Sequence, residues 1–309
     1  MTDSRRVTVG SRASPLALAQ TEEVLRVLRL DHPDVRFEVV PIATGGDSNK
    51  DAPLLSLGRG TFVKEIEAAL LRGDIDVAVH SAKDLPASLA DGLVIAAFGQ
   101  RRNALDVLVD RWNSPLDELP PGARIGTGSP RRISQLKAAR PDIELLPIRG
   151  NVGTRLEKAV GNDYDGVVLA AAGLLRLGRE DAISEYLAPE ICTPDAGQGA
   201  LAVQARSDSS EIIELLSSVN HALTSIAVRA ERAFVAAIGG GCTAPIGAYG
   251  QVVEGRLDVM AMAAEPDGSR VVRVRESYDS GDPEAAGRLV ADSLISAGAG
   301  ELASWDGRR

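Results

Sequence analysis

The chain has 309 residues, of which 44% are hydrophobic and 25% charged, a balance typical of two or three globular domains rather than of a disordered chain. With 34 basic and 43 acidic residues, its formal net charge is −9, which argues against a general nucleic-acid binder. Two cysteines and three histidines exclude a disulfide-stapled scaffold and disfavour a zinc site, and no apolar run approaches the roughly 20 residues of a membrane span.

The first hundred residues alternate strand-like and helix-like segments, which predicts a mainly parallel α/β sheet. The dipeptide Ser14-Pro15 opens a helix, because serine is a good N-cap and proline fits the first helical position. A second helix ends at Gly73. The strands are expected at Arg6–Gly10, Val35–Ile42, Ile75–Val79 and Leu93–Phe98, and the second helix at Thr61–Arg72.

The same alternation returns in the next hundred residues, which indicates two similar lobes. Ile125 leads into Gly126-Thr127-Gly128-Ser129-Pro130, a second Ser-Pro helix opening. A strand at Ile143–Ile148, a helix at Asn151–Val160 and a strand at Gly166–Ala170 follow. Two polar or glycine-rich stretches are interpreted as crossings between the lobes, Gln100–Asn103 and Pro194–Gly199, after which Leu201–Arg206 returns to the first lobe as a strand.

The last ninety residues follow a different pattern, that of a small α+β unit. A long helix, His221–Ile238, ends at a run of three glycines, and Pro266-Asp267-Gly268 is typical of a hairpin turn. Three strands are expected near Ile246–Val252, Arg256–Ala263 and Val271–Glu276, before a closing helix at about Pro283–Ala299. We therefore expect three domains: residues 1–100 with 200–218, residues 104–194, and residues 220–309.

Cys242 follows the glycine run, in Gly239-Gly240-Gly241-Cys242-Thr243-Ala244-Pro245. Glycines leave the thiol uncrowded, so a bulky partner can reach it. Thiol catalysis needs a base, and no histidine neighbours Cys242 in sequence, which favours a tether over a turnover nucleophile. Cys192, beside Thr193 and Pro194, is given no role.

A second candidate site is His80-Ser81-Ala82-Lys83-Asp84-Leu85-Pro86, directly after a predicted strand. The carboxyl ends of strands are where α/β sheets bind ligands. Lys83 and Asp84 place a cation and a carboxylate there within one turn. The alternative is an ordinary surface ion pair, worth roughly 0–1 kcal/mol.

Basic residues gather between Arg124 and Arg176, where nine Arg or Lys face five Asp or Glu. Several flank the helix openings, whose free backbone N–H groups attract anions. Arginine also binds carboxylates with two parallel hydrogen bonds. The pattern predicts a polycarboxylate or phosphate ligand held by Arg12 and Ser14, by Ser129, Arg131 and Arg132, and by Arg149 and Arg155.

These motifs, in this order, resemble the porphobilinogen deaminase (hydroxymethylbilane synthase) family along essentially the whole chain. Besides the stretches quoted above, the matches are Arg12-Ala13-Ser14-Pro15-Leu16-Ala17-Leu18, Phe62-Val63-Lys64-Glu65, Gly126-Thr127-Gly128-Ser129-Pro130-Arg131-Arg132, Arg149-Gly150-Asn151-Val152-Gly153-Thr154-Arg155, Leu169-Ala170-Ala171-Ala172-Gly173-Leu174, Gly197-Gln198-Gly199-Ala200, Glu231-Arg232-Ala233 and Pro245-Ile246-Gly247. The predicted lid loop, about Gly45–Gly60, departs most from the family pattern.

The resemblance implies a transferase that joins four porphobilinogen molecules head to tail into the linear tetrapyrrole hydroxymethylbilane, losing ammonia at each step. It implies a dipyrromethane cofactor held by a thioether to Cys242, and no metal. It also implies a fold of two lobes resembling type 2 periplasmic binding proteins, plus the α+β domain with a three-stranded antiparallel sheet. Expected partners are porphobilinogen and a uroporphyrinogen III synthase that receives the product, with no nucleic acid or membrane, for a cytoplasmic monomer.

The same residue-by-residue match implies roles for individual side chains. Asp84 is the catalytic carboxylate, which stabilises positive charge on the substrate pyrrole and serves the proton transfers. The cofactor-binding residues are expected to be Ser81, Lys83, Thr127, Ser129, Arg131, Arg132 and Arg155, and the substrate-binding residues Arg12, Ser14, Arg149, Arg155 and Arg176.

Two alternatives stay open from the residues. A noncatalytic two-lobed anion receptor or sensor would use the same helix openings but would have no use for Cys242. A cysteine hydrolase would need His80 or His221 beside Cys242 in space. Intact-mass spectrometry separates these readings, because only the deaminase carries a two-pyrrole adduct.

Overall fold

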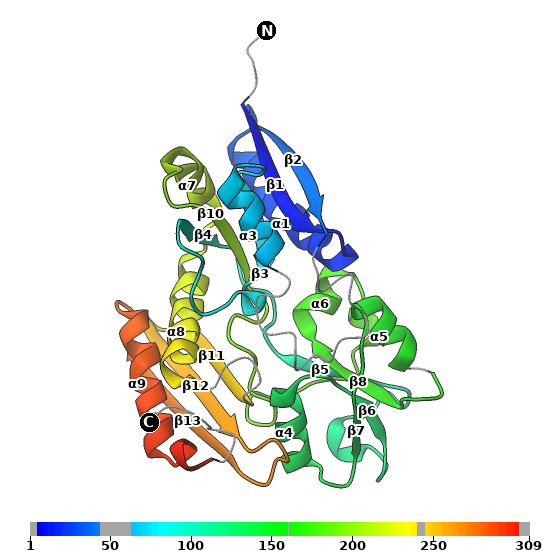
Figure 1. Cartoon of the computed structure of the whole chain (residues 1–309). Coiled ribbons are helices and arrows are strands. Elements are labelled where there is room, and N and C mark those ends of the chain that lie inside the picture. Colours follow the sequence, from blue (N-terminus) through cyan, green and yellow to red (C-terminus); the bar gives the residue numbers. More distant parts are fainter. Residues whose placement is uncertain (1–4, 44–62, 160, 240–244, 303–309) are drawn as a thin grey trace. The chain divides into compact units, whose positions relative to one another are not determined.

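The computed structural model describes residues 5–43, 63–159, 161–239 and 245–302, and Figure 1 shows their helices and strands. By its internal contacts the chain divides into two compact units. Unit 1 comprises Met1–Arg102 and Ala200–Ser225, and unit 2 comprises Asn103–Gly199 and Ile226–Arg309. The predicted lid loop and Cys242 lie outside the described residues.

Unit 1 is built on a mixed sheet whose described strands follow the order β2-β1-β3-β10-β4. Neighbours β1, β2 and β3 are parallel, and β10 runs antiparallel to both β3 and β4. The elements of this unit are β1 (Arg6–Arg12), α1 (Pro15–Asp31), β2 (Arg36–Ile42), α3 (Lys64–Arg72), β3 (Val77–Ser81), β4 (Leu93–Phe98), β10 (Leu201–Arg206) and α7 (Ser210–Leu216).

Helices cover both faces of this sheet, because alternate strand residues point to opposite sides. Val77 and Val79 of β3 pack in one cluster with Leu25 and Leu28 of α1. Ala78, between them, packs in another cluster with Leu70 of α3. Strand β3 is thereby packed between α1 on one face of the sheet and α3 on the other.

Unit 2 contains a second sheet, with described strands in the order β7-β6-β8-β5-β9. Again three parallel strands lie beside an antiparallel one, β5, which precedes them in the chain. The elements are β5 (Asp106–Asp110), β6 (Arg124–Gly126), α4 (Pro130–Ala139), β7 (Glu144–Leu146), α5 (Val152–Ala159), β8 (Gly166–Ala170), α6 (Ala171–Arg176) and β9 (Glu185–Tyr186).

The two sheets share one plan, which confirms the prediction of two similar α/β lobes. In each sheet, the three parallel strands lie side by side in the order second, first, third, counted along the chain. An antiparallel strand then pairs with the third. That antiparallel strand follows a predicted crossing: β5 follows Gln100–Asn103, and β10 follows Pro194–Gly199. The predicted return of Leu201–Arg206 to the first sheet is confirmed.

The C-terminal part of unit 2 is an antiparallel three-stranded sheet, as predicted. Alternate residues of its middle strand, such as Leu257 and Val259, pack in one cluster with Phe234 of one helix and Val290 of another. Its elements are α8 (Ala222–Ile238), whose residues from Ile226 belong to unit 2, β11 (Ile246–Val253), β12 (Arg256–Ala264), β13 (Val271–Asp279) and α9 (Pro283–Ser296). The division into domains at 104–194 and 220–309 stays a prediction.

The other face of this sheet lies against the second lobe within unit 2. A Cβ on Gly247 of β11 would lie 2.9 Å from the carbonyl oxygen of Thr193 and 3.2 Å from Cδ of Arg131. In the β12–β13 turn, Gly268 has φ +76° and a Cβ there would lie 2.5 Å from the Ser134 carbonyl oxygen. Glycine is therefore required at Gly268 both by the turn and by its close approach to α4.

Several elements differ from the sequence expectation: α6, α7 and β9 were not expected, and two strands inside the sheets, β3 and β5, also differ. The strand expected at Ile75–Val79 is shifted to Val77–Ser81, because β10 pairs with it as far as Ser81. The strand β5 was not predicted; it is defined by its pairing with β8, a segment about sixty residues away in the chain. Both differences arise from pairings between distant segments, which local patterns do not carry.

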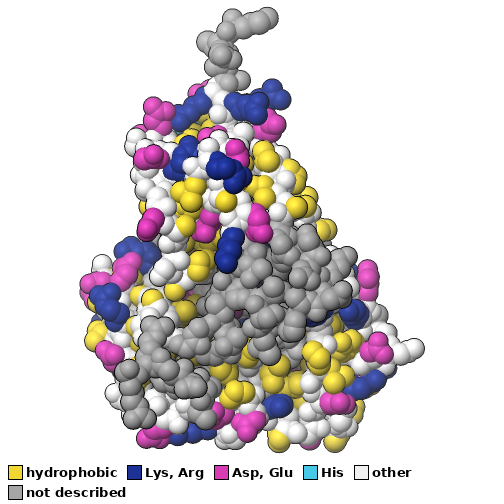
Figure 2. Space-filling view, viewed as in Figure 1, with side chains coloured by type: hydrophobic (Ala, Val, Ile, Leu, Met, Phe, Trp, Pro, Cys, Tyr) yellow, Lys and Arg dark blue, Asp and Glu magenta, His cyan; other side chains and the backbone are white. Residues whose placement is uncertain are grey.

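Within the described ranges, no helix combines the length and apolar character needed to cross a membrane. Figure 2 shows basic and acidic side chains interspersed over one face of the described surface.

Candidate functional site

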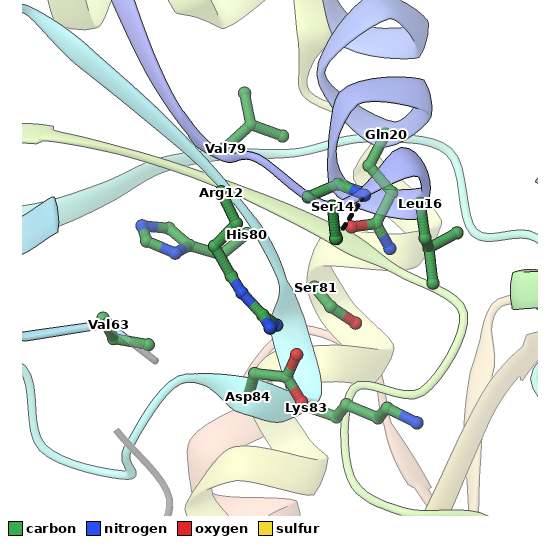
Figure 3. Close-up of a pocket in the computed structure, with 11 residues that line it drawn as sticks. Arg12, Ser14, Leu16, Gln20, Val63, Val79, His80, Ser81, Lys83 and Asp84 are labelled. Carbon is green, nitrogen blue, oxygen red and sulfur yellow. Dashed lines mark hydrogen bonds between the residues drawn. The ribbon is translucent and has the colours of Figure 1, made fainter. Parts of the chain in front are cut away.

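A cavity in unit 1 lies where β1 and β3 end. Because these strands are parallel neighbours, their carboxyl ends meet at one edge of the sheet. β1 ends at Arg12, and β3 ends at Ser81 and continues into a 3₁₀ turn, Ala82–Asp84. The residues that line the cavity are Arg12, Ser14, Leu16, Ala17, Gln20, Val63, Val79, His80, Ser81, Lys83 and Asp84 (Figure 3).

The start of α1 adds an anion-binding element to this cavity. Ser14 is the N-cap and its side chain accepts a hydrogen bond of 3.2 Å from the Ala17 N–H, with Pro15 at the first helical position. The remaining first-turn N–H groups are positively polarised. This confirms the predicted Ser-Pro helix opening, and it places Ser14 in one cavity with Arg12.

Asp84 is the carboxylate in this cavity. It is half-buried and forms no hydrogen bond or ion pair with any described residue. In Figure 3 the guanidinium end of Arg12 extends toward it. With Lys83 also on the wall, the site combines two cations with one carboxylate. It suits a ligand that carries acid groups together with N–H donors.

In unit 2, the carboxyl ends of β6, β7 and β8 also meet at one sheet edge, because these strands are parallel. Thr127 and Ser129 follow β6 and precede α4. The Ser129 side chain does not cap the helix; instead the Thr127 Oγ1 accepts a hydrogen bond of 3.3 Å from the Ser129 N–H. The Ser129 hydroxyl is thus not used in capping α4.

The segment that follows β7 brings Arg149 and Arg155 to the same edge. Asn151 Oδ1 accepts the Thr154 N–H at 2.9 Å and so caps α5. Gly150 has φ +115°, a conformation that glycine permits, and its carbonyl accepts a 2.8 Å hydrogen bond from Arg155 Nε. The turn therefore orients Arg155 through its own backbone.

Arg155 lies in a region of excess positive charge. Burial, together with the nearby charge of Arg132, lowers the pKa of its guanidinium to about 10. The group stays protonated at neutral pH, but at a cost in electrostatic free energy that a bound carboxylate would relieve. This is the chemistry expected of a site for an anionic ligand.

Arg131 and Arg132, expected to hold cofactor carboxylates, are both buried against one acid, Asp106. Arg131 donates to Asp106 Oδ2 at 2.6 Å, and Arg132 donates to Oδ1 at 2.6 Å. Arg131 Nε is buried and has no hydrogen-bond partner among the described residues. Their part in holding the cofactor stays a prediction.

Asp106 is a functional residue of this unit that the sequence did not predict. Gln198, in the second crossing, donates 2.9 Å and 2.7 Å hydrogen bonds to Asp106 Oδ1 and the Ala104 carbonyl. Burial alone would raise the pKa of Asp106, but the charges of Arg131 and Arg132 outweigh it and hold that pKa well below its usual range. The only sequence signal is a charged residue heading an apolar run, Asp106-Val107-Leu108-Val109.

Replacing Asp106 by asparagine is expected to destabilise the protein by about 3–5 kcal/mol, because two buried guanidinium groups lose their counter-charge. Urea unfolding at neutral pH measures this loss. Asp142→Asn, which breaks an exposed pair with Arg140, is the matched control and should change stability little. The unfolded chain protonates Asp106 near pH ~4, so the stabilisation shrinks as the pH falls below that value. An Asp106→Asn protein as stable as wild type would contradict this account.

Arg176 and Cys192 are two further residues of unit 2 that the sequence analysis considered, and Cys192 lies beside Asp106. Arg176, at the end of α6, donates a 3.0 Å hydrogen bond to the carbonyl of Gly199. Cys192 is fully buried, and its Sγ lies 3.2 Å from Asp106 Oδ2. Burial, reinforced by the charge of Asp106, raises the pKa of its thiol to about 12. Cys192 is therefore an unreactive packed thiol.

The described residues thus form two groups of site residues, one in each unit. One cavity holds Arg12, Ser14, Ser81, Lys83 and Asp84. The second group follows the parallel strands of unit 2 and contains Thr127, Ser129, Arg131, Arg132, Arg149 and Arg155. Within the described ranges, no group of His, Cys, Asp and Glu side chains is arranged to hold a metal ion.

Two α/β lobes with cationic residues and helix starts at the ends of their parallel strands define a binding protein for an anionic ligand, and Asp84 adds a group fit for acid–base chemistry. Comparison with family models gives a more specific assignment than this class of protein. Residues 7–214 match the porphobilinogen deaminase, dipyromethane cofactor binding domain, and residues 225–296 match the porphobilinogen deaminase C-terminal domain. The chain belongs to the porphobilinogen deaminase family.

Individual relatives agree with the family models. The chain is 49% identical over 300 residues to a porphobilinogen deaminase of Geobacillus kaustophilus, covering 96% of each chain. It is 46% identical over 299 residues to one of Pelotomaculum thermopropionicum, again covering 96% of each. Among solved structures, the methionine-binding protein MetQ gives a TM-score of 0.41 at 16% identity, covering 70% of this chain and 89% of that one.

Proposed function

We propose that this chain converts porphobilinogen into hydroxymethylbilane, by deaminating four substrate molecules and joining them head to tail on a dipyrromethane cofactor. The observation that carries the proposal is the cavity at the ends of β1 and β3, where the Asp84 carboxylate lies with Arg12 and Lys83. Porphobilinogen has matching groups: an acetate, a propionate, a pyrrole N–H and an aminomethyl group.

The residues of unit 2 fit the cofactor, whose pyrroles also carry acetate and propionate groups. Arg155, with its lowered pKa, and Arg131, whose buried Nε has no partner among the described residues, are donors that carboxylates would satisfy. Arg132, Ser129 and Thr127 lie at the same sheet edge. When bound, the cofactor supplies the pyrrole carbon to which the first substrate is joined.

We propose Cys242 as the attachment point. The chain has two cysteines, and Cys192 is buried with a thiol pKa raised to about 12. Cys242 is five residues from Gly247, a span of at most about 18 Å, and Gly247 lies against Arg131. A group tethered there is within reach of the cationic edge of unit 2.

In the proposed reaction, Arg12, Lys83 and the first turn of α1 bind the acid groups of the substrate. The Asp84 carboxylate accepts the pyrrole N–H and stabilises the positive charge that develops on the ring as the amine leaves. The aminomethyl group, bound as an ammonium, leaves as ammonia and takes with it the electron pair of the broken carbon–nitrogen bond. The Asp84 carboxylate then accepts the proton that the newly joined ring carbon loses when the carbon–carbon bond is complete. Arg149 and Arg176 are proposed as further substrate ligands.

The test is turnover of porphobilinogen by the purified protein. We expect one ammonia to be released for each porphobilinogen consumed, and hydroxymethylbilane to accumulate. Measured binding of porphobilinogen without ammonia release would instead indicate the noncatalytic anion receptor. We also propose that the protein acts as a cytoplasmic monomer and passes its product to uroporphyrinogen III synthase.

A further inference from the structure

A chain of hydrogen bonds runs through unit 1 behind the Asp84 cavity. His80 Nε2 lies 3.1 Å from Gln204 Oε1, and Gln204 Nε2 donates a 2.9 Å hydrogen bond to Glu67 Oε1. The three side chains are buried and come from β3, β10 and α3. Neither Gln204 nor Glu67 has a role in the reaction described above.

The carboxylate at the end of this chain fixes where the protons lie. Gln204 donates through its NH₂ group to the Glu67 oxygen Oε1, which accepts, and so turns its carbonyl oxygen toward His80. A carbonyl oxygen also only accepts, so His80 Nε2 must carry the hydrogen. In the neutral ring, Nδ1 is then left with a lone pair and no proton.

The His80 ring is neutral at physiological pH. Burial lowers its pKa to about 4, and the hydrogen bond to Gln204 opposes this only in part. The imidazole is therefore an uncharged group beside Arg12 and Lys83, which are cations. It is also a hydrogen-bond acceptor at Nδ1, whereas both cations only donate.

His80 lies on the wall of the Asp84 cavity. Only 6% of its surface is exposed, and Nδ1 forms no hydrogen bond with any described residue. Figure 3 shows the ring on the side of β3 toward Val63, with Ser81 on the other side. An acceptor on the wall of this cavity that is not used within the described protein is available to an N–H donor of a ligand.

We infer that His80 is a substrate-binding residue, whose Nδ1 accepts a hydrogen bond from an N–H group of porphobilinogen. Gln204 and Glu67 are positioning residues that hold the ring in the required tautomer. With its acid groups ionised, porphobilinogen donates hydrogen bonds only from its pyrrole nitrogen and its aminomethyl group. A neutral acceptor thus binds the nitrogen-bearing part of the substrate, while the cations bind its carboxylates. The inference rests on the proposed function.

Two substitutions separate this role from a structural one. The side-chain amide of asparagine reaches the position of Nδ1, whereas that of glutamine reaches the position of Nε2. His80→Asn keeps an acceptor at the cavity and loses the bond to Gln204, so kcat/KM should stay within about fivefold of wild type. His80→Gln keeps the bond to Gln204 and loses the acceptor, so kcat/KM should fall by about 20-fold or more.

The order of the two variants decides the question. If His80 serves only to hold β3 and β10 together, His80→Gln will be the more active and more heat-stable variant, and the inference is wrong. Equal activities would overturn it as well. Wild-type turnover in the same assay shows whether a failure concerns this inference or the proposed function.

Glu67→Gln tests the inference without changing the ring, should both His80 variants fail to fold. With an amide at position 67, Gln204 can point either its NH₂ group or its carbonyl oxygen at His80. The ring is then no longer held in one tautomer. The kcat/KM for porphobilinogen should fall by about fivefold, mainly through KM, with the melting temperature near that of wild type. An unchanged kcat/KM in a folded Glu67→Gln protein would contradict the positioning role.

Discussion

Asp84→Asn is expected to lower the kcat for porphobilinogen by about 10²–10³-fold while the protein stays folded. Asparagine keeps the shape of the side chain but carries no negative charge and cannot hold or release the proton. Because Asp84 forms no hydrogen bond or ion pair with any described residue, folding does not depend on its charge. Initial rates of ammonia release, with a thermal melt of the same sample, measure both parts of the prediction.

Asp74→Asn is the matched control for this variant. Asp74 is an exposed acid of the same unit, paired with Arg72 at 2.7 Å, and it does not line the cavity. It should leave both kcat and the melting temperature near their wild-type values. Wild-type kcat in Asp84→Asn would remove Asp84 from the proposed mechanism.

Cys242→Ala is expected to abolish both covalent pigment and turnover, since the growing chain has no other accessible thiol on which to be anchored. Cys192→Ala is the control: it removes the other cysteine, which is buried beside Asp106, and should keep the covalent group. Colour development with a pyrrole reagent after denaturation, and ammonia release before it, measure the two effects. Bound pigment in denatured Cys242→Ala, or its loss in Cys192→Ala, would show that the attachment lies elsewhere.

Much of the fold follows from local sequence patterns. The Ser14-Pro15 and Ser129-Pro130 helix starts, the Gly73 stop and the β12–β13 turn were predicted correctly, because caps and turns depend on neighbouring residues. The extent of β3 and the existence of β5 were not, because they depend on pairing with β10 and β8. Strand pairing between segments far apart in the chain leaves no local signal.

The site was predictable to a similar extent. Lys83 and Asp84 were predicted from a motif that ends a strand, Arg12 and Ser14 from a helix opening, and Ser81 from the family resemblance. The structure brings all five residues to one cavity. Asp106 was missed because its partners lie 25 to 92 residues away in the chain. The same distance explains why Arg131 and Arg132 could not be recognised as buried: whether an arginine faces solvent or a buried acid depends on tertiary contacts.

The intact mass of the purified wild-type protein, followed by peptide mapping, tests the central claim most directly. The account predicts a mass above that of the polypeptide by two linked pyrroles with their acid side chains. After digestion, that increment should be found on the peptide that contains Cys242. A mass equal to that of the bare polypeptide in a sample that turns over porphobilinogen, or an increment on the Cys192 peptide, would contradict it.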